Sequence, residues 1–237
     1  MDALINGILE DTDYRSNHPY LKALADGSFE KKDFVETQIQ FYYAVVFFSR
    51  PMAAVAAKIP DNRMRREVLR NVWEEHGEGE TDDEHESTFL TFLERLDAIT
   101  EQDVLRRKLW PEIRMFNTTL TGACVMDEYL VGVGVLGMIE RMFADISAAI
   151  GDSVVERGWI TQARLTHYKT HAELDIRHAD DFFNVLRPAW AADNANRYII
   201  EQGMRLGAHC FDELYRGLWH ARKRRWTREH VVPNVRT

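Results

Sequence analysis

The sequence predicts a single all-α domain, and three observations support this prediction. Apolar residues recur at the three- and four-residue spacing of helices along most of the chain. No segment shows the sustained alternation of a β-strand, and no repeat at a fixed period is present. The 13 glycines and six prolines among 237 residues are few for an all-β fold with many tight turns. An apolar content of 45% can fill a sizeable core, which excludes a disordered protein.

Short polar segments and segments with glycine or proline separate the predicted helices in the N-terminal part of the chain. The predicted helices cover residues 3–10, 18–26, a long segment from residue 30, 63–75 and 84–96. Pro51 is expected to kink or interrupt the long helix, because proline removes a backbone N–H from a helix interior. The acidic, glycine-containing segment 77–83 is expected to be a loop.

The C-terminal part continues in the same way, with helices expected at 101–117, 121–150, 156–187 and 193–226. Pro111 falls near the middle of the first, Gly151 and Pro188 should end the second and third, and Asp193 should cap the last. The long helices would form an antiparallel bundle of seven or eight helices, able to hold a cofactor in its core. This domain should span residues 1–226, and a flexible tail should span 227–237.

Charge and composition restrict the function. The net charge of −8 argues against nucleic-acid binding, and we interpret the basic run 220–226 as a solvated helix end. No apolar run approaches the roughly 20 residues that span a bilayer, and the N-terminus does not resemble a secretory signal. Two cysteines are too few for a disulfide framework. We therefore expect a cytoplasmic protein with no nucleic-acid or membrane partner.

The strongest chemical motif is formed by His171, Asp175 and His178 in the predicted helix 156–187. Steps of four and three residues return to the same helical face, so the three side chains point the same way. Two imidazoles and a carboxylate on one face suit a metal ion. The alternative is the polar stripe of a solvated helix, because further charged residues surround the motif.

Other positions favour the metal site. Glu140 follows an otherwise apolar stretch, 131–139, and a buried carboxylate is costly without a partner. Glu75 and His85 stand on either side of the acidic loop, at a helix end and a helix start. Each also has an ordinary explanation, since Glu is common near helix ends and a loop His is usually solvated.

Three carboxylates and three imidazoles therefore lie on separate predicted helices: Glu75, His85, Glu140, His171, Asp175 and His178. Mixed oxygen and nitrogen ligands with carboxylates able to bridge suit two iron or manganese ions better than a structural zinc, which favours thiolates. Bundles supply such ligands from facing helices. Glycines at 132, 134 and 137 would allow neighbouring backbone or a ligand to approach closely.

This pattern resembles the haem-oxygenase-like diiron oxidases and oxygenases, whose superfamily includes the chlamydial death-domain-associating protein. The resemblance rests on Glu-Glu-His-Gly-Glu-Gly-Glu-x4-His at 74–85, the lone Glu140 and the final His-x3-Asp-x2-His motif. It covers roughly residues 18–220. It implies that the six residues bind two iron ions, with Glu140 as a bridging carboxylate and manganese as the alternative in one site. Glu74 and Glu78 are close alternatives to Glu75.

The resemblance also implies a reaction. Such enzymes use O₂ as cosubstrate, and an external electron donor where one is needed, and many act on amino acids or fatty acids. Desaturation, C–C cleavage or N-oxygenation of a small carboxylate-bearing substrate is therefore expected, in a homodimer. Members that consume their own side chains have Tyr beside the mid-chain Glu and Lys about ten residues on. Ile139 and Ile150 at those places argue against that mechanism here.

Substrate-binding candidates are aromatic residues at helical spacing and one arginine on the last helix: Tyr42, Tyr43, Phe47, Phe116, Phe182 and Arg205. Arg205 would clamp a substrate carboxylate. The ordinary explanation is core packing for the aromatic residues and solvation for the arginine.

Other interpretations stay open. A metal-independent enzyme like the quinone synthases would leave the six-residue set unexplained. A thiaminase II-like enzyme would need a Cys nucleophile, for which Cys124 is available in a sequence unlike that motif. A haem site needs one His and no carboxylates. The non-enzymatic alternative is a helical interaction protein that binds a partner through its charged faces.

Overall fold

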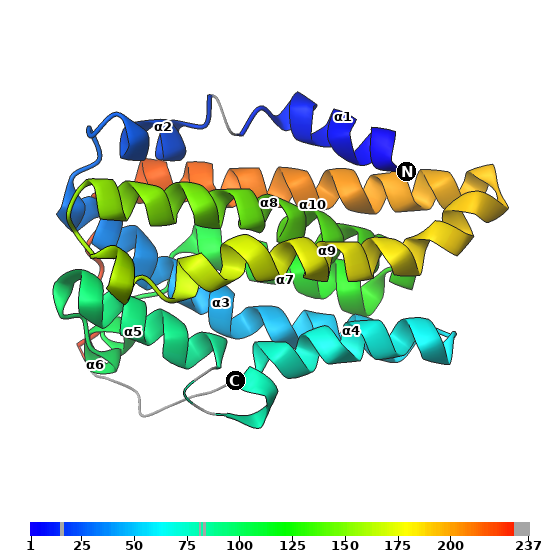
Figure 1. Cartoon of the computed structure of the whole chain (residues 1–237), viewed down its shortest axis with the longest axis horizontal. Helices are drawn as coiled ribbons and strands as arrows, with labels where there is room; N and C mark the ends of the chain where they lie inside the picture. Colours follow the sequence, from blue (N-terminus) through cyan, green and yellow to red (C-terminus); the bar gives the residue numbers. More distant parts are fainter. Residues whose placement is uncertain (15–16, 81, 83, 230–237) are drawn as a thin grey trace.

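The chain folds into ten α-helices within the residues that the computed structural model describes, 1–14, 17–80, 82 and 84–229. Figure 1 shows their order along the chain. They are α1 Asp2–Thr12, α2 Pro19–Ala25, α3 Lys31–Lys58, α4 Asn62–Glu75, α5 His85–Asp97, α6 Glu101–Leu105, α7 Pro111–Thr121, α8 Tyr129–Glu156, α9 His167–Ala192 and α10 Asn194–Ala221. The described residues contain no strand, only an isolated bridge between Arg107 and Thr227, so the predicted all-α class is confirmed.

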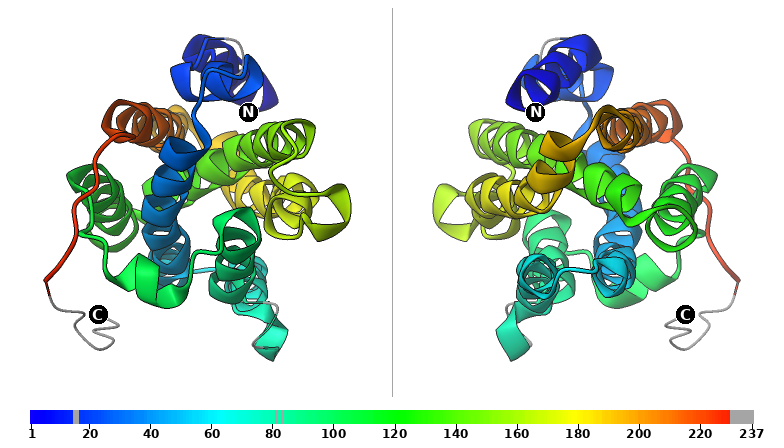
Figure 2. Two further views of the ribbon diagram at one scale, coloured as in Figure 1. Left: turned by 90° about the vertical axis from the view of Figure 1, so that its left-hand side faces the viewer. Right: turned by 90° about the vertical axis from the view of Figure 1, so that its right-hand side faces the viewer.

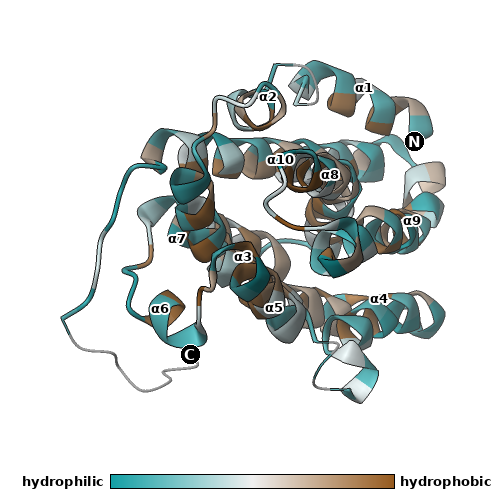
Figure 3. Ribbon diagram, turned by 60° about the vertical axis from the view of Figure 1, so that its left-hand side comes forward, coloured by the Kyte–Doolittle hydropathy of each residue, from teal (hydrophilic) through white to brown (hydrophobic). Residues whose placement is uncertain are grey.

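Helix α8 is the central element of the bundle and packs along α9 and α10 (Figure 1). It is apolar around most of its circumference, as Figure 3 shows, and most of its residues are buried. Contact with α10 is close because α10 carries Gly203 and Gly207 there. A Cβ atom at these positions would lie 2.5 Å from the Val131 carbonyl oxygen and 2.4 Å from that of Val135. Backbone packing of this kind requires glycine.

The other helices surround this centre. α1 and α2 cover the α10 and α8 side, at the top of Figure 1, while α3, α4 and α5 lie on the opposite side (Figure 2). α3 has a window of mean hydropathy 1.2, long and apolar enough to cross a membrane by length and composition alone. Because 56% of that window is buried inside the fold, the same values describe a core helix, and they carry no membrane assignment.

Two prolines act differently from expectation. Pro51 lies inside α3, which continues without interruption to Lys58 because Met52, Val55 and Ala56 beyond it are buried in the core. The predicted helix 101–117 is wrong. It divides into α6 and α7, and Pro111 takes the first position of α7, where a missing N–H costs nothing.

The boundaries of the next helices also differ from the sequence prediction. The predicted helix 121–150 is broken by a π-turn, Gly122–Met126, and α8 starts at Tyr129. Gly151 does not stop α8, because it is a close-approach position where a Cβ would lie 3.1 Å from Leu165 Cδ2. α9 starts only at His167 and runs through Pro188. Asp193 caps α10 as predicted, and its side chain accepts a hydrogen bond from the Asn196 backbone N–H.

In the basic run 220–226, His220, Lys223, Arg225 and Trp226 are exposed, while two arginines also pair with acidic residues of the domain. Arg224 Nη1 lies 2.8 Å from Glu112 Oε2, and Arg225 Nη2 lies 2.6 Å from Asp33 Oδ1. The chain stays attached at Thr227, which bridges to Arg107. Residues 230–237 of the predicted flexible tail lie outside the described residues.

Candidate metal centre

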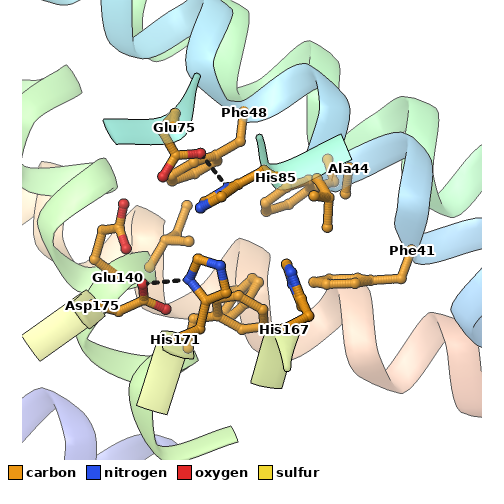
Figure 4. Close-up of a pocket in the computed structure, with 14 residues that line it drawn as sticks. Phe41, Ala44, Phe48, Glu75, His85, Glu140, His167, His171 and Asp175 are labelled. Atoms are coloured by element: carbon orange, nitrogen blue, oxygen red, sulfur yellow. Dashed lines mark hydrogen bonds and ion pairs between the residues drawn. The ribbon is translucent and has the colours of Figure 1, made fainter. Parts of the chain in front are cut away.

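A tight turn brings the first two predicted ligands together. Glu75 is the last residue of α4 and His85 the first of α5. The chain reverses through a 3₁₀ turn, Gly77–Gly79, in which Gly77 and Gly79 have φ of 60° and 96°. As a result, Glu75 Oε2 lies 2.5 Å from His85 Nδ1 (Figure 4).

The remaining ligand candidates come from α8 and α9. Glu140 from α8 faces His178 from α9, and His178 Nδ1 lies 3.8 Å from Glu140 Oε1 and 3.9 Å from Glu75 Oε1. One donor atom of each of these three buried residues lies within 4.8 Å of the other two. One turn before His178, Asp175 Oδ1 lies 2.7 Å from His171 Nδ1. The structure therefore places all six predicted residues around one centre, where Figure 4 labels five of them.

Several donor atoms at this centre have no hydrogen-bond partner among the described residues. They are His85 Nε2, Glu140 Oε1, Asp175 Oδ2 and His178 Nδ1. Buried polar atoms in proteins are almost always paired, and each unpaired one costs about 1–3 kcal/mol. Four such atoms on four of the six predicted ligands fit a bound metal ion better than a structural polar cluster.

Burial and mutual repulsion shift the acidities of these groups. Burial, with the charge of Asp175, raises the pKa of Glu140 to about 7. Burial raises the pKa of Asp175 well above its usual value and lowers that of His171 to about 4. For His178, burial is outweighed by nearby carboxylates, Glu140 first, which raise its pKa to about 10. A divalent cation would neutralise the charge of these closely spaced, buried carboxylates.

Glu74 and Glu78, the alternatives to Glu75, lie elsewhere. Glu74 Oε2 is 2.7 Å from His178 Nε2, on the side of the ring away from the centre, and Glu74 also pairs with Arg177. Glu78 is exposed in the turn and has φ of 53°. Of the three, only Glu75 points into the centre.

A cavity of about 40 Å³ adjoins the centre. Apart from the polar residues it is lined by Phe41, Ala44, Val45, Phe48, Phe116, Ile139, Phe143 and Phe211. Of the predicted aromatic candidates, only Phe116 lines this cavity. The sequence analysis missed the stripe at 41, 44, 45 and 48 on α3, although its helical spacing was visible.

The other aromatic candidates point elsewhere because they lie on different helical faces. The Tyr42 hydroxyl donates to Glu86 Oε1 at 2.7 Å, and the Tyr43 hydroxyl to the Val104 carbonyl oxygen at 2.8 Å. Phe47 packs under the Arg50 guanidinium. Phe182 is buried against α8, where a Cβ added at Gly137 would lie 3.1 Å from the Cβ of Phe182. Gly137 therefore allows α9 to pack closely on α8.

Arg205 does not line the cavity, so the structure gives no support to its expected role as a carboxylate clamp. It lies half-exposed on α10 and pairs with Glu201, at 2.8 Å, and with Asp11 of α1. No lysine or arginine is found among the described residues that line the cavity.

Cys124 offers no support for a thiol nucleophile. It is fully buried and does not line the cavity, and burial raises the pKa of its thiol to about 12. A thiol with a raised pKa is unreactive at neutral pH.

His167 is the polar lining residue that the sequence analysis missed. It stands one turn before His171 and is 1% exposed, and burial lowers its pKa well below the usual value. Spacing gave the signal, since residues 167, 171, 175 and 178 continue one face of α9.

Comparison with known proteins agrees with this architecture. A family model described as an iron-containing redox enzyme matches residues 35–212. A solved domain of unknown function with a heme oxygenase-like fold, from Shewanella denitrificans, superposes with a TM-score of 0.73 at 15% identity. The match covers 94% of this chain and 90% of that one. This likeness confirms the predicted haem-oxygenase-like fold.

Two curated proteins are similar in sequence. The 4-aminobenzoate synthase of Chlamydia pneumoniae is 20% identical over 191 residues, 81% of this chain and 83% of that protein. The 4-chloro-allylglycine synthase of Streptantibioticus cattleyicolor is 22% identical over 187 residues, 79% of this chain and 70% of that protein.

Proposed function

This chain belongs to the family of iron-containing redox enzymes, and we propose that it is an O₂-dependent oxidase or oxygenase with two iron ions. The ligands would be Glu75, His85, Glu140, His171, Asp175 and His178. The observation that carries the proposal is the set of buried, unpaired donor atoms on four of these residues, His85, Glu140, Asp175 and His178. Three carboxylates and three imidazoles, all but His85 buried, have the composition that two iron ions need, since carboxylates bridge and imidazoles complete the shell.

Two bound iron ions would supply the reduction of O₂ and the oxidation of a substrate bond. The protein supplies the rest. Glu74 fixes His178 from outside the centre, because a carboxylate on one ring nitrogen orients the other nitrogen toward a metal. The phenylalanine-lined cavity excludes water from the reacting groups.

The substrate would be a small molecule bound in this cavity and changed by desaturation, C–C cleavage or N-oxygenation. The resemblance implies a carboxylate-bearing compound, such as an amino acid or a fatty acid. The lining supports only the apolar part of that expectation, because it offers aromatic and aliphatic surface and no cationic side chain among the described residues. We therefore propose that the apolar part of the substrate occupies the cavity.

The test is to load the metal-free protein with Fe(II) anaerobically and then expose it to O₂. O₂ consumption and visible absorption are followed, with Glu140→Gln as the matched control. The proposal predicts O₂-dependent absorption changes in the wild type and their loss in the variant, because Gln cannot bridge two ions as a carboxylate does. Iron that stays ferrous in air, or a Glu140→Gln variant that reacts like the wild type, would refute it.

A further inference from the structure

His167 is the polar residue of the cavity that the proposed ligand set does not use. It lies on α9 one turn before His171, and the centroids of the two rings are 4.3 Å apart. In Figure 4 it stands between His171 and Phe41, on the side of the cavity away from Glu140 and Asp175. Its ring is buried, with Phe89 packed edge-on against it at 4.8 Å between centroids.

The hydrogen bonds around Thr88 define which nitrogen of His167 carries the proton. The Thr88 hydroxyl donates to the His85 carbonyl oxygen at 3.2 Å, which uses its only hydrogen. His167 Nδ1 lies 3.0 Å from the same hydroxyl oxygen. Both contacts are hydrogen bonds only where Nδ1–H is the donor, so we assign the ring proton to Nδ1. The neutral ring therefore has an unprotonated Nε2 with its lone pair free.

This Nε2 atom is buried and has no hydrogen-bond partner among the described residues. Beyond the ligand candidates and His167, the lining residues that the structure describes are all apolar. A single acceptor in an apolar cavity binds a donor selectively, because a ligand without the donor leaves the nitrogen unpaired.

A lone pair on nitrogen can also bind a metal ion, but the placement favours a substrate. His167 stands next to Phe41, at the phenylalanine-lined part of the cavity and on the side away from Glu140 and Asp175, two of the proposed ligands (Figure 4).

We infer that His167 Nε2 accepts a hydrogen bond from the substrate, which is a small, largely apolar molecule with one hydroxyl or uncharged amine group. This inference rests on the proposed function, which makes the cavity a substrate site. A carboxylate at this end of the substrate is disfavoured, since it would meet a lone pair and no cation. Phe48 and Phe143 line the cavity and are only partly buried, so a ring larger than the cavity of about 40 Å³ would be admitted by their rotation.

The experiment compares phenol with fluorobenzene, which has nearly the same shape and no donor. Binding is measured by NMR titration of the full chain, metal-free and loaded with diamagnetic Zn(II). The variants are His167→Phe, which removes the acceptor, and His167→Gln, whose side-chain oxygen replaces Nε2. The ¹⁵N shifts of the His167 ring report on the acceptor directly.

We expect the wild type to bind phenol about 10-fold more tightly than fluorobenzene, in both metal states. His167→Phe should lose this preference while keeping the metal content of the wild type, and His167→Gln should retain it. Phenol should also shift the Nε2 resonance of His167.

Equal affinity for the two probes in the wild type would overturn the inference even where the variants fail to fold. A preference that survives in His167→Phe, or that requires Zn(II), would assign the acceptor to another group or to the metal, and would also overturn it. The metal-free titration does not depend on iron, so its outcome is separate from a failure of the proposed function.

Discussion

Glu74 Oε2 lies 2.7 Å from Nε2 of His178, while Nδ1 of the same ring faces Glu75 and Glu140. Two successive residues at the end of α4 therefore contact opposite sides of one imidazole. Glu74 accepts the Nε2 proton, so a metal ion at the centre would bind Nδ1 by displacing the proton that the nearby carboxylates hold there. In this arrangement Glu75 is placed as a metal ligand, whereas Glu74 orients His178, another ligand.

Glu74→Gln should weaken iron binding about 10-fold, because a neutral amide orients His178 less well and makes it a poorer ligand. The matched control is Glu78→Gln, which changes an exposed Glu in the adjoining turn and should leave affinity unchanged. Competition with a chelator of known affinity measures both. Equal losses in the two variants would show that the acidity of the turn, and not the Glu74–His178 contact, determines affinity.

The raised pKa of Glu140 makes the stability of the metal-free protein depend on pH. Its carboxyl titrates near pH 7 when folded and near 4.5 when unfolded. Its contribution is therefore full below about pH 4.5 and is lost as pH rises through 7, since the folded state holds the proton more tightly. Glu140→Gln should match the wild type near pH 4 and be more stable by about 3 kcal/mol near pH 8.

Urea unfolding of chelated wild type and Glu140→Gln at the two pH values measures this difference. Excess Fe(II) should reverse the order near pH 8, because only the wild type gains the full stabilisation by metal. Parallel stability profiles for the two metal-free proteins would contradict the assignment of Glu140 as a buried carboxyl with a raised pKa.

Gly207→Ala should destabilise the fold by about 2 kcal/mol, because its Cβ would lie 2.4 Å from the Val135 carbonyl oxygen. Gly7→Ala is the control, since it is also a helix glycine and a Cβ there meets nothing within 4 Å. That variant should gain about 0.5 kcal/mol from helix propensity. Thermal unfolding distinguishes the two, and equal effects would contradict the close packing of α8 on α10.

Arg205→Ala should leave both iron content and substrate turnover unchanged, because Arg205 contacts Glu201 and Asp11 and does not line the cavity. Its effect on stability should stay within about 0.5 kcal/mol, as for other exposed ion pairs. A raised KM in this variant would show that Arg205 reaches the substrate after all.

The sequence predicted the grouping of the six ligand candidates because each lies where a simple rule applies. His171, Asp175 and His178 recur on one helical face, and Glu140 follows an apolar stretch. Glu75 could not be separated from Glu74 by spacing. That choice depends on how α4 lies against α9, where Arg177 and His178 hold Glu74 outside the centre.

Helix boundaries were less predictable at prolines and glycines, because these residues do not end a helix wherever tertiary packing favours its continuation. Pro111 starts a helix, Pro51 and Pro188 lie inside helices, and Gly151 fits the approach of Leu165. The aromatic residues that line the cavity were predicted incorrectly for a related reason. Tyr42 and Phe41 are adjacent in sequence but about 100° apart around α3, so only the orientation of the helix decides which one faces the cavity.

The central claim is tested most directly by the number of iron ions that one chain binds. Metal-free wild type and Glu140→Ala are titrated anaerobically with Fe(II), and the bound iron is measured after removal of excess metal. The account predicts about two ions per wild-type chain and about one or fewer in the variant, which lacks the central carboxylate. A wild type that binds less than about one ion, or a variant that binds as many as the wild type, would contradict it.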